Sequence, residues 1–117
     1  MGNELDTALI SRDKKEVEKY CQDPMVHDKV SPNYSISFID AGLWAIENAS
    51  LLSCPMLLLH GTADQITDPT CSEAFAKNTD LVTLKLYRGG YHELHNDLCK
   101  EEVLHDITDW LETQIEK

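Results

Sequence analysis

An aspartate and a histidine, Asp64 and His92, are the two side chains whose place in the sequence best suits catalysis. Asp64 comes four residues after the apolar run that ends at His60, and His92 comes five residues after the alternating run that ends at Tyr87. A carboxylate that holds one imidazole nitrogen orients the ring and stabilises its cation, so the other nitrogen can act as a base toward a hydroxyl nucleophile. The glycine pair in the second loop would let that loop bend toward the carboxylate.

Two strands are predicted to bring these side chains together. Residues 54–60 form an unbroken apolar run, typical of a strand covered on both faces in a parallel sheet. Residues 81–87 alternate between apolar and polar, which indicates a second strand. Because neighbouring parallel strands lie about 4.8 Å apart and end at one edge, the loops that carry Asp64 and His92 should meet there.

Helices are expected to alternate with these strands. Residues 69–77 suit a helix capped by Asp68, and residues 97–115 have the apolar spacing of a closing helix. Asp68 is a helix cap in this interpretation and the alternative acid if Asp64 points away. The order strand, helix, strand, helix predicts an α/β fold with a right-handed crossover, whose further strands come from a longer chain or another subunit.

The N-terminal part is predicted to hold a short helix near residues 13–20 and a longer helix over residues 33–49. The longer helix carries an apolar stripe with two interpretations. The stripe docks the helix on its neighbours, or it lines an acyl-chain tunnel or a cap that touches a membrane. The stripe consists of Ile36, Phe38, Ile39, Leu43 and Trp44.

Composition excludes several classes of protein. Acidic residues outnumber basic ones by 21 to 10, and the net charge of −11 argues against nucleic acid and against strong attraction to anionic lipid. The N-terminus lacks an apolar signal-peptide core and no apolar run spans a bilayer, so a cytoplasmic location is expected. Four cysteines without a C-x-x-C pair predict buried thiols in a reducing compartment. His92 and His95 lack the spacing of a zinc protease, so no metal is expected.

Two segments carry a resemblance to a known family. Residues 54–69, CPMLLLHGTADQITDP, and residues 86–96, LYRGGYHELHN, resemble the C-terminal end of an α/β-hydrolase, most closely the monoacylglycerol lipase and lysophospholipase group of serine hydrolases. Residues 9–13 and 23–31 are similar to the cap region of that group. The resemblance implies the last two parallel strands with flanking helices over 51–117 and part of a helical cap over 1–50.

The resemblance also assigns roles. Asp64 matches the acid of the family's catalytic triad and His92 its histidine, in the hydrolase order. The nucleophile of the family stands in a Gly-x-Ser-x-Gly elbow, and no serine of this sequence is flanked in that way. We therefore expect the C-terminal fragment of a hydrolase, inactive alone, whose serine lies outside these 117 residues.

Two functions remain open at this point. The first is a serine hydrolase that acts on the ester of a monoacylglycerol or lysophospholipid without a metal or organic cofactor. Its partners would be the lipid ester and the N-terminal half of the hydrolase, with weak membrane contact through the cap as a further option. The alternative is a non-catalytic hydrolase remnant that binds a partner or completes its sheet by self-association.

Overall fold

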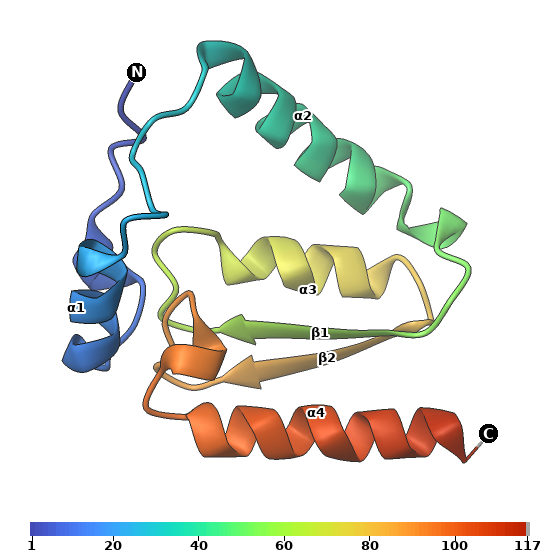
Figure 1. The fold of residues 1–117 in the computed structure, drawn as a ribbon. Helices are drawn as coiled ribbons and strands as arrows, with labels where there is room; N and C mark the ends of the chain where they lie inside the picture. The colour runs from blue at the N-terminus through green and yellow to red at the C-terminus, as the bar shows by residue number, and fades with distance from the viewer. Residues whose placement is uncertain (117) are drawn as a thin grey trace.

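A two-stranded parallel sheet forms the centre of the computed structural model, which describes residues 1–116. The strands are β1 (Met56–Gly61) and β2 (Val82–Tyr87), as the apolar and alternating runs predict. The register pairs Gly61 with Tyr87, so the two strands end at the same level. Both arrowheads in Figure 1 therefore lie at one edge of the molecule, where the loops that follow the strands emerge.

Two helices cover opposite faces of this sheet (Figure 1). They are α3 (Pro69–Lys77), which connects the strands, and α4 (Lys100–Ile115), which closes the chain. Side chains alternate along β1, so that Leu58 lies on the side of α3 and Leu59 packs against α4. This arrangement confirms the predicted α/β fold with its helical crossover.

The buried core lies between the sheet and α4. Tyr87 is 4% exposed, and its hydroxyl donates a hydrogen bond of 2.7 Å to Asp106 on the helix. This pairing satisfies the one polar atom that the tyrosine carries into the core. The other residues of the core and its margin are Leu59, Leu94, Cys99, Val103 and Ile107.

The N-terminal half holds the two predicted helices. Asp13 caps α1 (Lys14–Gln22) by accepting from the backbone of Lys15, and Ser31 caps α2 (Pro32–Glu47) by accepting from Tyr34. Figure 1 shows α2 rising away from the sheet, whereas α1 lies beside the C-terminal ends of the strands. Three short 3-10 turns complete the fold: η1 (Thr7–Leu9), η2 (Ala49–Leu51) and η3 (Leu94–Asn96).

The apolar stripe of α2 does not dock on its neighbours within residues 1–116. Its five residues are between 58% and 62% exposed. The helix meets α3 near its C-terminal end, where the side-chain amide of Asn78 donates a hydrogen bond of 2.7 Å to the carbonyl of Ile46. The docking interpretation is therefore wrong for the described residues, because periodicity shows which face of a helix is apolar but not what covers it.

The prediction of buried cysteines is also wrong in most cases. Cys21, Cys54 and Cys71 are exposed, and Cys99 alone is half-buried, beside the core. A two-stranded sheet with the four helices of the described residues is too small to cover these thiols, including Cys71, which lies on α3. Among the helices of residues 1–116, none combines the length and the apolar character that crossing a bilayer demands.

Candidate catalytic site

The structure brings Asp64 and His92 together. Asp64 lies in the loop after β1 and His92 in the loop after β2, and Oδ2 of the aspartate is 2.9 Å from Nδ1 of the histidine. The two residues are 28 positions apart in the sequence, and the chain between them forms the crossover through α3. The parallel register alone brings the two loops to one edge, and hydrogen bonds between the loops then fix the contact.

The two loops are joined by hydrogen bonds, and glycines allow their close approach. The N–H of Ala63 donates to the carbonyl of Gly90 at 3.0 Å, and the N–H of Gly89 donates to the hydroxyl of Thr62 at 2.8 Å. A Cβ atom on Gly61 would lie only 2.1 Å from the carbonyl oxygen of Gly90. Gly89 has φ of +75°, a left-handed conformation that glycine adopts without strain. The glycines thus allow the approach that places His92 against Asp64.

Asp64 is buried and accepts a full set of hydrogen bonds. Its Oδ1 accepts from the backbone N–H groups of Ile66 at 2.8 Å and Thr67 at 3.1 Å, and its Oδ2 accepts from the Thr67 hydroxyl at 3.0 Å. Burial raises the pKa of Asp64, but the hydrogen bonds from His92, Thr67 and Ile66 outweigh it and hold that pKa below its ordinary value. Asp64 is therefore a fixed anion at neutral pH.

His92 is oriented on one side and open on the other. Because a carboxylate only accepts, Nδ1 carries the proton of the bond to Asp64, so the lone pair of the neutral ring lies on Nε2. Within residues 1–116 no hydrogen bond uses Nε2, and the side chain is 38% exposed. A neutral imidazole held in this tautomer and open to solvent at Nε2 has the geometry of a general base.

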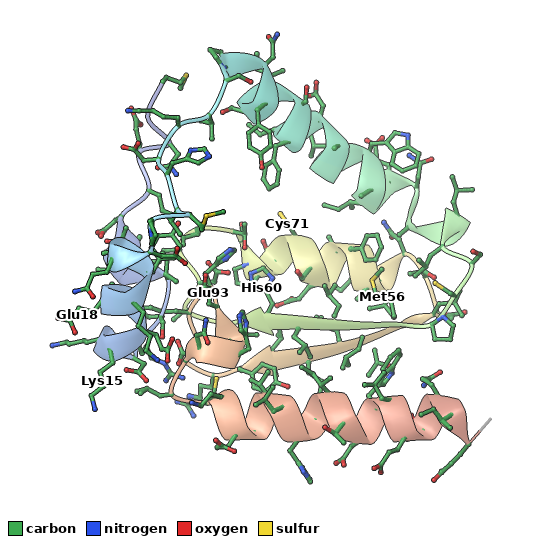
Figure 2. The ribbon with its side chains drawn as sticks, viewed as in Figure 1. Lys15, Glu18, Met56, His60, Cys71 and Glu93 are labelled. Atoms are coloured by element: carbon green, nitrogen blue, oxygen red, sulfur yellow. The ribbon has the colours of Figure 1, made fainter. Side chains whose placement is uncertain are left out.

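His60 and Thr67 belong to the same cluster, although the sequence analysis gave them no part in it. Nε2 of His60 lies 3.1 Å from Oδ2 of Asp64 and bonds to the carbonyl of Thr67 at 3.0 Å, while Nδ1 lies 2.6 Å from the Ser72 hydroxyl. Figure 2 shows His60 at the C-terminal end of β1, on the side of α3. The alternation along β1 could have placed His60 on that side, and an aspartate three residues before a threonine is a known turn pattern.

Two other side chains considered from the sequence lie outside the pair. Asp68 caps α3, where its carboxylate accepts from the N–H of Thr70 at 2.9 Å and from the Thr70 hydroxyl at 2.7 Å. These two bonds hold the pKa of Asp68 below its ordinary value, and the bond from the Thr70 hydroxyl has the larger effect. His95 lies exposed in η3, and within residues 1–116 no group of three or more histidine, cysteine, aspartate or glutamate side chains is arranged to hold a metal ion.

An apolar groove of about 600 Å³ leads to this cluster. It runs between α2, α3 and β1, and its polar end is formed by His60, Thr67, Asp68 and Ser72. Figure 2 shows the side chain of Cys71 extending from α3 on the side that faces α2. The apolar lining includes Phe38, Ile39, Leu43, Ile46, Leu58 and Phe75. The exposed stripe of α2 thus contributes to one wall of the groove.

The crossover from β1 to β2, with an aspartate after one strand and a histidine after the other, has the C-terminal architecture of an α/β-hydrolase. Residues 1–99 match the family described as serine aminopeptidase, S33, and the chain belongs to that family. Within the α/β-hydrolases it falls in the monoacylglycerol lipase group. The family that the sequence resembles is therefore confirmed.

Several relatives support this placement. The chain is 33% identical to the monoglyceride lipase of Rattus norvegicus over 95% of its own length and 38% of that protein. It is 34% identical to the monoacylglycerol lipase of Mycolicibacterium smegmatis over 92% of its length and 39% of that protein. The crystal structure of the Paleococcus ferrophilus monoacylglycerol lipase superposes with a TM-score of 0.90 at 36% identity, over 95% of this chain and 44% of that one. The chain thus spans less than half the length of these proteins.

Proposed function

We propose that this chain supplies the acid and the base of the catalytic triad of a serine ester hydrolase. The observation that carries the proposal is the 2.9 Å contact between Asp64 and His92, with Nε2 of the histidine left open. Nε2 takes the proton of a serine hydroxyl as the oxygen attacks the ester carbonyl, and the imidazolium returns this proton to the leaving alcohol. Nε2 of His92 then takes a proton from water as the water attacks the acyl-enzyme, and it returns this proton to the serine oxygen. Asp64 stabilises each imidazolium that forms.

The serine of the proposed reaction comes from a segment outside these 117 residues. No serine of the sequence lies in a Gly-x-Ser-x-Gly elbow, the strained turn that exposes the nucleophile in this fold. An aspartate and histidine without a nucleophile cannot form the covalent intermediate. The chain alone is therefore inactive in this proposal.

The proposed substrate is a lipid ester with a single acyl chain, such as a monoacylglycerol or a lysophospholipid. The support is the apolar groove of about 600 Å³, whose polar end contacts the cluster around Asp64. Such a groove suits one aliphatic chain with its ester near the base. The relatives named as monoacylglycerol lipases favour the first of the two headgroups.

A fluorophosphonate probe that labels activated serines, read by intact mass, tests this proposal. We expect no label on the 117-residue chain and one label on a longer natural form that contains an elbow serine. A label on the short chain would mean that His92 activates one of its own serines. No label on either form would favour a non-catalytic binding module, which the exposed stripe of α2 supports as the second candidate.

The roles of the two residues are tested in that longer form. His92→Ala and Asp64→Asn should each lower turnover by about a thousandfold or more. Asp109→Asn is the matched control, because Asp109 lies on the exposed surface of α4 and pairs with His105 rather than with His92. Turnover that survives either of the first two substitutions would remove that residue from the triad.

A further inference from the structure

A segment near the N-terminus reaches the loop that carries His92. The backbone N–H of Arg12 donates to Oδ2 of Asp97 at 3.0 Å, and its Nε donates to Oδ1 of the same carboxylate at 2.5 Å. The two residues are 85 positions apart in the sequence. Figure 1 shows the chain before α1 beside the C-terminal ends of both strands, where this contact forms.

The N-terminal segment that contains Ile10 and Arg12 is bonded, directly or through Asp97, to the chain on both sides of His92. The N–H of Tyr91, the residue before the histidine, donates to Oδ2 of Asp97 at 3.2 Å. The N–H of Glu93, the residue after it, donates to the carbonyl of Ile10 at 2.9 Å. Ile10 lies in the same segment as Arg12, and Asp97 is bonded to Arg12. The backbone around His92 therefore depends on this segment.

Asp97 is the residue through which this dependence acts. It is 2% exposed, and burial raises its pKa. The hydrogen bonds from Arg12, Tyr91 and Leu98 outweigh burial and hold the pKa of Asp97 below its ordinary value. A buried carboxylate that loses its guanidinium partner keeps its charge but only its backbone donors, and it can reach new donors only if the loop moves.

We propose that Arg12 is a positioning residue, which through Asp97 holds the His92 loop where the imidazole meets Asp64. The importance of this contact for catalysis rests on the function proposed above, whereas the loop geometry does not. A residue that merely stabilised the fold would affect the sheet as a whole. A positioning residue affects the loop first, because the N–H of Tyr91 bonds to the carboxylate that Arg12 holds and Glu93 bonds to Ile10, two residues before Arg12.

The test is amide hydrogen exchange by NMR on the full chain, with no substrate present. In Arg12→Gln we expect the Tyr91 and Glu93 amides to exchange about tenfold faster or more, while the amides of β1 keep their protection. The NMR signal of the Nδ1 proton of His92 should become weaker. The carboxyl pKa of Asp64 should rise, because Asp64 loses the hydrogen bond from His92. Both variants keep the backbone donor of residue 12, but Arg12→Lys also keeps the positive charge, so it should restore part of the protection.

Lys85→Gln is the matched control, because it breaks a different ion pair, Lys85 with Asp106 at 3.3 Å, away from the loop. It should leave the Tyr91 and Glu93 amides unchanged. Equal exchange in wild type and Arg12→Gln would overturn the proposal. Loss of protection at all amides together in both Arg12 variants would also overturn it, by making the pair a support of the whole fold. The exchange rates do not depend on whether the fluorophosphonate probe labels a serine. The positioning role of Arg12 and the proposed hydrolase function can therefore be contradicted independently.

Discussion

At the scale of single residues, two glycines differ in the space that a side chain would find. A Cβ on Gly61 would lie 2.1 Å from the carbonyl oxygen of Gly90, whereas a Cβ on Gly42, within α2, would meet no atom within 4 Å. Gly61→Ala must therefore separate the loops that carry Asp64 and His92, and Gly42→Ala only removes backbone freedom from the unfolded chain.

We expect Gly61→Ala to lower the free energy of unfolding by about 3 kcal/mol. Gly42→Ala should raise it by about 0.5–1 kcal/mol, the usual gain for this change within a helix. Urea unfolding followed by circular dichroism measures both. Two variants with the same midpoint would show that the loops tolerate a side chain at Gly61.

Two buried carboxylates make the stability depend on pH. Asp64 and Asp97 have a pKa that is lower in the folded chain than the ordinary value of about 3.9 in the unfolded chain. A group of this kind stabilises the fold above its unfolded pKa, and the contribution is lost as the pH falls through its folded pKa. For these two groups, we expect the urea midpoint of unfolding to stay constant between pH 7 and 5 and to decrease steeply below about pH 4.

Asp97→Asn tests this dependence at one of the two sites. It should lower the midpoint at pH 7, since Arg12 loses its anionic partner, and make the acid decrease shallower. Asp40→Asn, on the exposed surface of α2, is the control and should leave the midpoint at pH 7 unchanged. An acid profile of Asp97→Asn identical to that of the wild type would exclude Asp97 as a source of the pH dependence.

At the scale of elements, local signals predicted most of the fold. The proline after Asp68 and the apolar run before Gly61 fix the boundaries of α3 and β1, because caps and strand burial depend on adjacent residues. The contact of Asp64 with His92 was predictable because a parallel register brings strand ends together. The bond from Arg12 to Asp97 was not, since no local pattern relates residues 85 positions apart.

The exposure of α2 could not be predicted from the sequence either. This exposure predicts how the chain tolerates substitution. Leu43 is 58% exposed and Val103 on α4 is 1% exposed. Leu43→Ala should therefore change the free energy of unfolding by about 0.5 kcal/mol or less, whereas Val103→Ala should lower it by about 2 kcal/mol. Urea unfolding at micromolar protein measures the difference. An equally large loss from Leu43→Ala would mean that the stripe of α2 is covered in solution.

At the scale of the whole molecule, the described residues leave much apolar surface open. The sheet has two strands, and neither outer edge pairs with another strand within residues 1–116. The face of α4 away from the loops borders a second hollow, lined by residues such as Leu57, Trp110 and Leu111. Exposed strand edges and apolar patches of this kind favour association with another chain.

Self-association is therefore the prediction that belongs to the molecule as a whole. Against the apolar attraction stands the net charge of −11, whose repulsion extends about 30 Å at 0.01 M salt and about 8 Å at 0.15 M. Sedimentation equilibrium should give an average mass above the 13.3 kDa of the chain, which rises with protein concentration and with salt.

Substitution on the stripe identifies the surface that associates. Ile39→Glu places a like charge on the exposed face of α2 and should lower the average mass toward that of the monomer. Glu18→Gln, on the exposed surface of α1, is the control and should leave the mass unchanged or slightly higher. A wild-type chain that unfolds cooperatively and stays at 13.3 kDa across both salt conditions would contradict self-association. It would also weaken the proposal that these residues normally complete a larger hydrolase.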